Sequence, residues 1–245
     1  MGNLLKWEMS RTFTSKSFWI IGGALVILPS LLLLLGIFFG ARYTGYGAFQ
    51  EGLGNYNAFI IFLIGIFAGI HVTGAFEGRK IQSAVMAGNS RFSILMSKFL
   101  SYTTAVTIFS MLSIGMLMAV SFKMIGTDGF DGSIVRDVMA KAAVYVVVEI
   151  AYSASCFLTS MLVRHLGGSI GLNLGVMLGL NLIAQIFLNF DWAVDYVRMA
   201  PAGQAMILVG DASNSNLAMA LMSSVVVIAA VIAFSYIKFD REELK

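Results

Sequence analysis

The sequence predicts an all-α integral membrane protein with six membrane-spanning helices. Of its 245 residues, 58% are hydrophobic and only 12% are charged, and the mean hydropathy is +0.86. A soluble domain of this size cannot hide so much apolar surface from water. Six apolar runs are long enough to cross the roughly 30 Å hydrocarbon core of a bilayer as helices. They are continuously apolar rather than alternating, which excludes a membrane β-barrel.

The predicted elements follow one another along a single domain, residues 1–245. Residues 3–14 place Leu5, Met9 and Phe13 at four-residue spacing, which predicts a short helix lying in the inner membrane interface. The six predicted spans are residues 18–39, 57–76, 99–122, 142–163, 166–190 and 217–237. The long connection at residues 191–215 has an apolar middle. It either dips back into the outer edge of the membrane or lies on the surface.

The distribution of basic residues orients the chain. With both termini in the cytoplasm, eleven of the sixteen Lys and Arg residues lie on the inner side. Because inner loops of membrane proteins are enriched in Lys and Arg, we expect this orientation. The low cysteine count, the high methionine count and the lysine-containing tail are compatible with a bacterium. We therefore expect a multi-pass protein of a bacterial cell membrane.

The loop between the second and third spans carries the most distinctive pattern, FEGRKIQSAVMAGNSRFSILMSK at residues 76–98. The acid Glu77 ends the second span, and an amphipathic helix through Ile81 and Val85 follows it. A turn at residues 88–91 then leads to Lys98 at the start of the third span. By residue pattern alone, this segment is either a handle for a soluble partner or a solvated inner loop that obeys the charge rule.

This order resembles the permease subunits of the type-2 ABC transporter family. In that family an acid ending the second span precedes a cytoplasmic coupling helix, a turn with an arginine, and a lysine that opens the third span. Many members carry a proline in the turn where this chain has Asn89 or Ser90. The resemblance covers the whole chain in topology and residues 77–98 in sequence. The ATPase-coupling residues that it implies are Glu77, Gly78, Arg79, Lys80, Ile81, Val85, Gly88, Asn89 and Arg91.

The resemblance also implies partners. Two permease copies, identical or related, would pair in the membrane lipid, and each would set its coupling helix in a groove of a cytoplasmic ABC ATPase. ATP and Mg²⁺ would be used by that ATPase, because this chain lacks the G-x-x-x-x-G-K-[ST] string of a P-loop. We expect no cofactor and no metal in this chain. The net charge of +3 is too small to indicate a nucleic-acid partner.

Polar residues inside the spans are few. Glu149 is the only acid within a span, and Tyr145, Tyr152 and Ser153 share its helical face. This stripe either lines the substrate route or the dimer seam, or it only locks helix packing. In the fifth span, Gly167, Gly171, Gly175 and Gly179 form a four-residue ladder that permits close helix approach. The ladder faces either a second copy or a helix of the same subunit.

These observations favour the permease of an ABC exporter over three alternatives. The first is a secondary transporter coupled through Glu149, and the second is a membrane subunit that transports nothing. An intramembrane enzyme is the third, but the spans hold only one Glu, one His and one Cys, at different depths. A chain with an apolar interior and a mildly acidic outer face suits the export of amphipathic peptides, antibiotics or other apolar cargo.

Overall fold

The computed structural model describes residues 2–78, 80–126, 132–210 and 214–241, and every regular element in these ranges is helical. Six helical stretches are long and apolar enough to cross a membrane, which confirms the prediction of an all-α chain with six candidate spans. The elements are α1 (Gly2–Thr14), α2 (Lys16–Phe38), α3 (Gly45–Ala68), the π-helical turn η1 (Gly69–Thr73), α4 (Gly74–Glu77), α5 (Lys80–Met86), α6 (Arg91–Met124), α7 (Gly132–Leu162), α8 (Leu166–Phe187), α9 (Asp191–Met199), α10 (Pro201–Gly210) and α11 (Asn214–Asp240).

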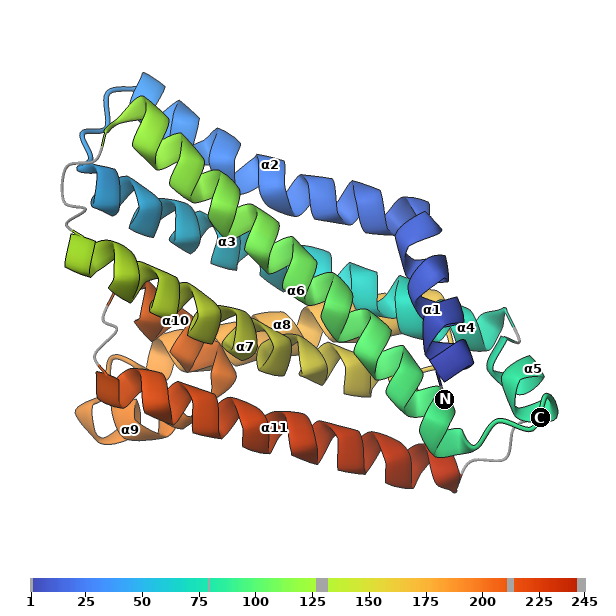
Figure 1. Cartoon of the computed structure of the whole chain (residues 1–245). Coiled ribbons are helices and arrows are strands. Elements are labelled where there is room, and N and C mark those ends of the chain that lie inside the picture. The colour runs from blue at the N-terminus through green and yellow to red at the C-terminus, as the bar shows by residue number, and fades with distance from the viewer. Residues whose placement is uncertain (1, 79, 127–131, 211–213, 242–245) are drawn as a thin grey trace.

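The long helices run side by side, so that the bundle has two distinct ends (Figure 1). One end carries α1, α4, α5 and the C-terminal end of α11, and the opposite end carries α9 and the connection between α2 and α3. The loops that we predict to be cytoplasmic therefore gather at one end, called here the inner end. The other is called the outer end. Which end faces the cytoplasm stays a prediction from the charge distribution.

Two spans are longer than the apolar runs indicate. The second stretch runs from Gly45 through Glu77 and the third from Arg91, against predicted starts at residues 57 and 99. Both starts are set by hydroxyl caps: the Thr44 side chain accepts from the Gly47 amide at 3.1 Å, and the Ser90 side chain accepts from the Ser93 amide at 3.2 Å. These caps satisfy backbone N–H groups that have no partner within the helix.

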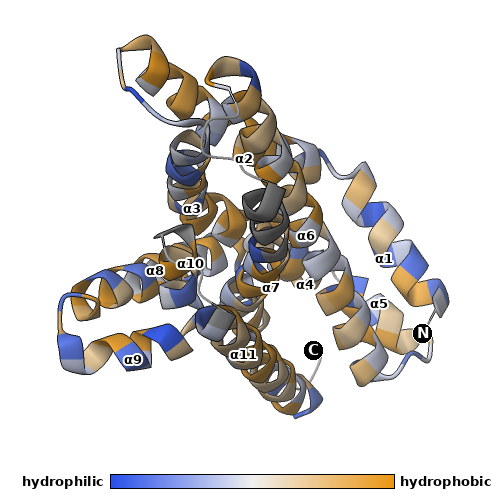
Figure 2. Cartoon of the chain, turned by 60° about the vertical axis from the view of Figure 1, so that its left-hand side comes forward, coloured by the Kyte–Doolittle hydropathy of each residue, from blue (hydrophilic) through white to orange (hydrophobic). Residues whose placement is uncertain are grey.

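Apolar side chains cover much of the outer surface of the bundle. Figure 2 shows that the long helices are coloured mainly as hydrophobic, whereas hydrophilic residues concentrate in α1, α9 and the connections. Exposed side chains include Ile27 on α2, Met111 on α6 and Val226 on α11, each at least 60% exposed. Such a surface suits lipid contact rather than water.

The long outer connection turns back into the bundle. It forms a hairpin of two short helices, α9 and α10, and α10 buries Ala202, Gln204 and Ala205. Trp192 and Tyr196 on α9 are largely exposed, at 68% and 70%. The segment is thus helical and α10 packs into the bundle, whereas its dip into the outer edge of the membrane stays a prediction.

Candidate functional site

The inner loop forms a short helix that ends in a tight turn. In α5, Ile81 is 2% exposed and Val85 is half-buried, so one face packs against the bundle as the amphipathic pattern predicts. After α5 the Gly88 amide donates to the Val85 carbonyl at 2.9 Å and the Asn89 amide to the Ala84 carbonyl at 3.3 Å. This pair of bonds is a Schellman motif, and it requires the left-handed φ of +83° at Gly88.

Asn89 adds a side-chain bond to the same turn, because its amide Nδ2 donates to the Ala84 carbonyl at 3.0 Å. Asn89 and Ser90 thus stand where a proline is common in the family that this loop resembles. Asn89 closes the end of α5, and Ser90 caps the start of α6. The turn is therefore held by hydrogen bonds at both of its ends.

Two charged residues of the loop are tied to distant helix ends. A carboxylate oxygen of Glu77 accepts from the backbone amide of Leu166, the first residue of α8, at 2.6 Å. The guanidinium of Arg91 donates to the carbonyls of Phe239 and Asp240 at the end of α11, both at 2.7 Å. An acid at a helix start and a base at a helix end also match the helix dipole. The loop is thereby fastened to α8 and α11.

A third charge ties the loop to the N-terminal helix. The Lys98 ammonium lies 2.9 Å from a carboxylate oxygen of Glu8, and the two side chains are only 2% and 4% exposed. Arg11 lies 3.7 Å from the same oxygen. Sequence reasoning missed Glu8, because an acid on a short interfacial helix normally faces water. The one available signal was that Lys98 borders an apolar span.

The remaining loop residues form an exposed face. Gly78, Lys80 and Gly88 are exposed, and the Met86 side chain is 80% exposed. Arg79, which the sequence also assigns to ATPase coupling, lies outside the described residues. The structure thus divides the implied coupling set into internal ties at Glu77 and Arg91 and an exposed surface on α5.

A buried polar cluster joins the second span to α7 and α8 near the inner end of the bundle. The Thr73 hydroxyl donates to the Ser160 carbonyl at 2.9 Å and lies 2.7 Å from the Ser169 hydroxyl. The Asn173 side chain donates to the Gly65 carbonyl at 2.9 Å and to the Ser160 hydroxyl at 2.8 Å. Thr73 belongs to η1, and π-helical turns are frequent at functional positions. The cluster fixes the inner half of α8 to the helix that leads into the loop.

The polar stripe of α7 is buried inside the subunit. Tyr145, Glu149, Tyr152 and Ser153 are all at most 2% exposed. An interface with a second copy through this stripe therefore does not fit the arrangement seen here, and the route and packing interpretations remain. The Glu149 carboxylate oxygens and the Tyr145 hydroxyl form no hydrogen bond of normal distance and angle with a described residue, although these two groups lie close enough to interact with each other.

The glycine ladder of α8 faces away from the bundle. At Gly167, Gly171, Gly175 and Gly179 an added Cβ would meet no described atom within 4 Å. The opposite face of α8 buries Ser169, Asn173 and Met177. Of the two interpretations of the ladder, packing within the subunit does not fit this placement. The ladder forms a smooth surface that lipid or a second chain can cover.

Neither a protein-family model nor a curated protein sequence matches this chain. Among the described residues, no group of three or more His, Cys, Asp and Glu side chains could hold a metal ion. The candidate functional features of this chain are therefore the inner loop, the outward-facing glycine ladder of α8 and the buried polar stripe of α7.

Proposed function

We propose that this chain is the permease subunit of an ATP-driven ABC exporter, with α5 as its coupling helix. The observation that carries the proposal is the pairing of an exposed α5 face with internal ties from the same loop to α1, α8 and α11. A loop that only obeyed the charge rule would not need such fixed connections. The resemblance of residues 77–98 to the type-2 family supports the same function.

The ties explain how a force on α5 could reach the spans. A soluble ATPase that bound the exposed face would move α5 together with the turn at Gly88. Since Glu77 holds the start of α8 and Arg91 holds the end of α11, both helices would follow. Movement passes through packed elements with fixed contacts, so a short rigid helix suits this role. ATP and Mg²⁺ belong to the partner in this proposal.

The glycine face of α8 supports pairing with a second permease copy, because small residues allow close approach of helices in lipid. The cargo would pass along the seam between the copies. Its apolar surroundings suit amphipathic peptides, antibiotics or other apolar molecules. We place the protein in a cell membrane with both termini in the cytoplasm.

The test compares two matched double variants in co-purification with the ABC ATPases encoded beside this chain. Lys80→Glu with Met86→Glu changes the exposed face of α5, and Lys123→Glu with Met124→Glu makes the same changes at exposed positions of the outer end. We expect the first variant to lose the bound ATPase and its coupled ATP hydrolysis, and the second to retain both. If neither variant loses the ATPase, or if no ATPase binds the wild type, the proposal is wrong.

Arg91 is a poor choice for this test, although it is the most conspicuous charge of the loop. Its guanidinium holds the end of α11, so its removal would disturb the fold as well as the docking surface.

A second candidate function is a secondary transporter coupled through Glu149. The buried carboxylate without a hydrogen-bond partner favours it. Transport that needs an ion gradient and proceeds without any ATPase would distinguish this function from the first.

A further inference from the structure

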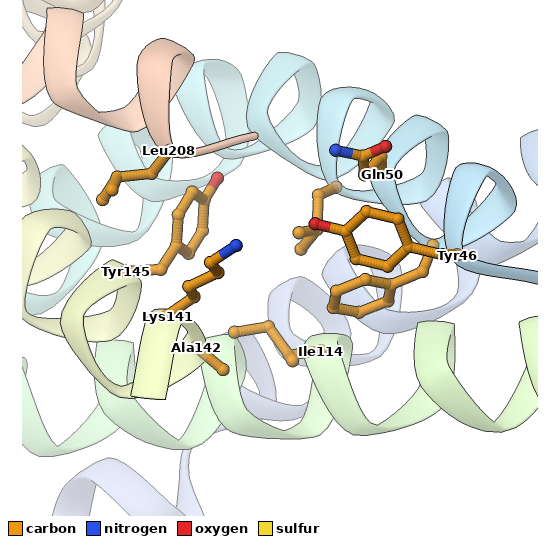
Figure 3. A pocket seen from close by; sticks show the side chains of 9 residues that line it. Tyr46, Gln50, Ile114, Lys141, Ala142, Tyr145 and Leu208 are labelled. Carbon is orange, nitrogen blue, oxygen red and sulfur yellow. The ribbon is translucent and has the colours of Figure 1, made fainter. Parts of the chain in front are cut away.

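A small cavity opens between α3, α6, α7 and α10 toward the outer end of the bundle (Figure 3). The volume of the cavity is about 20 Å³. A cavity needs roughly 10–15 Å³ to hold one water molecule. The cavity therefore has room for about one water molecule and none for a large cargo. The residues that line it are Tyr46, Phe49, Gln50, Leu53, Ile114, Lys141, Ala142, Tyr145 and Leu208.

The polar groups of this cavity come from α3 and α7. The Lys141 amine and the Tyr46 hydroxyl point into the space, and the ring of Tyr145 forms one wall (Figure 3). Lys141, Tyr145 and Glu149 follow one another at four-residue spacing, so they lie on one face of the helix. Eight residues of α-helix span about 12 Å. Along α7, Tyr145 therefore stands between Lys141 in the cavity and the deeply buried Glu149.

Among the described residues, the groups within electrostatic reach of Glu149 are hydroxyls, and none of them is a base. The Glu149 carboxyl is within electrostatic reach of the Tyr56 hydroxyl from α3 and of the Tyr145 and Tyr152 hydroxyls on α7. Residues 99–122 of α6, all of α8 and α10, and residues 214–237 of α11 contain no charged residue in the sequence. An ionised carboxylate in such a site would lack a counter-charge, at a cost of several kcal/mol. Glu149 therefore needs a cation, and the smallest one is a proton.

We propose that Glu149 is a proton-binding site that exchanges its proton with the outer side through this cavity, with the Tyr145 hydroxyl as the intermediate group. In the uptake step, a hydronium ion that enters the cavity from the outer side gives a proton to the Tyr145 oxygen, while Tyr145 passes its own proton to a carboxylate oxygen of Glu149. A neutral carboxylic acid forms, Tyr145 is regenerated, and the hydronium ion becomes a water molecule. The inference deepens the second candidate function, a transporter coupled through Glu149, and it does not depend on the proposed ATPase.

A metal cation fits the site less well. Hard divalent ions take six to eight oxygen ligands, whereas Glu149 offers one carboxylate among phenol hydroxyls. The cavity is also too small for a hydrated metal ion. The Tyr145 hydroxyl lies close enough to the Glu149 carboxyl to interact with it, as the passage of a proton between them requires.

Infrared spectroscopy of the purified full chain tests the proposal without any transport assay. A protonated carboxyl has a C=O stretching band that an ionised carboxylate lacks, and this band shifts when the proton is replaced by deuterium. We expect the wild type to show this band, Glu149→Gln to lose it, and transfer into D2O to shift it. Tyr145→Phe should slow the shift by about a hundredfold, the lower range for a positioned proton-transfer group.

Two controls make the result specific. Tyr102→Phe removes another buried hydroxyl, one that donates to the Ser153 carbonyl, and should exchange like the wild type. Ala142→Trp fills the cavity and should slow exchange, whereas Ile108→Trp, in an apolar groove between α2 and α6, should not.

Three results would overturn the proposal. The first is a spectrum in which Glu149→Gln removes no carboxyl band. The second is unchanged exchange in both Tyr145→Phe and Ala142→Trp, which would mean that the proton arrives by another path. The third is loss of the band on adding sodium in place of potassium, which would assign the site to a metal cation.

Discussion

The Glu8–Lys98 pair is the most deeply buried ion pair among the described residues, and its two charges come from different elements. The contact distance is 2.9 Å, and almost no water reaches either side chain. Removing two charges from water costs several kcal/mol for each ion, and their attraction offsets this cost only while both are present. The intact pair therefore stabilises the docking of α1 on α6 only weakly. Removal of one of its two charges should lower the free energy of unfolding strongly, because the other charge then stays buried without a partner.

We predict a strongly non-additive pair of substitutions at this contact. Lys98→Met leaves the Glu8 carboxylate buried without its main partner and should lower the free energy of unfolding by about 3–5 kcal/mol. Adding Glu8→Gln should restore much of this loss, because neither residue then carries an unpaired charge. Denaturant unfolding of the four chains in one detergent gives the interaction free energy. Additive losses would show that the two charges do not interact.

At the scale of elements, the number and type of the helices could be predicted, but two of their starts could not. Apolar run length places the second span at residue 57, whereas α3 begins at Gly45 and buries Ala48, Phe49 and Leu53. Gly, Gln and Glu interrupt the apolar pattern there, and only tertiary packing shows which face is buried. The hydroxyl caps at Thr44 and Ser90 were visible in the sequence, but many other Ser and Thr residues are equally good candidates.

The turn after α5 depends on a left-handed backbone conformation at Gly88. Gly88 has a φ of +83°, and an added Cβ there would meet no described atom within 4 Å, so only the backbone conformation restricts the residue. Gly88→Val should cost about 1–2 kcal/mol of unfolding free energy, because a left-handed conformation disfavours L residues by that amount. Gly88→Asn should cost less, since asparagine tolerates this conformation.

Ala87→Val is the matched control, as it adds the same side chain to the same exposed turn. Thermal or denaturant unfolding of Gly88→Val, Gly88→Asn and Ala87→Val measures these losses of unfolding free energy. Equal losses for Val and Asn at position 88 would mean that the left-handed conformation does not limit this turn.

At the scale of the whole molecule, the candidate site could be predicted only in its local part. Amphipathic spacing correctly placed Ile81 inward on α5. The partners of Glu77, Lys98 and Arg91 lie 89, 90 and 148 residues away along the chain. Such contacts depend on which helix ends meet at the inner end, and a single sequence does not specify that. The same charges that suggested a docking surface therefore turn out to organise the bundle as well.

The outward glycine face of α8 is the proposed contact surface between two copies of the chain. Gly175→Leu should leave the subunit folded, because an added Cβ meets no described atom within 4 Å, residue 175 is exposed, and leucine favours a helix over glycine by about 1 kcal/mol. In a pair of subunits that meet at this face, the same leucine would hold the two helices apart. We expect the dissociation constant of the pair to rise by about tenfold or more, or 1.4 kcal/mol. Energy transfer between labelled chains diluted in lipid measures it.

Gly115 on α6 provides the control, because it is exposed and an added Cβ there also meets no described atom within 4 Å. Gly115→Leu makes the same substitution on a different helix and should leave pairing unchanged. If both variants pair as the wild type does, the ladder faces lipid and the two copies must meet elsewhere. If Gly175→Leu alone abolishes pairing while the unfolding free energy stays the same, the smooth face of α8 is the surface through which two subunits assemble.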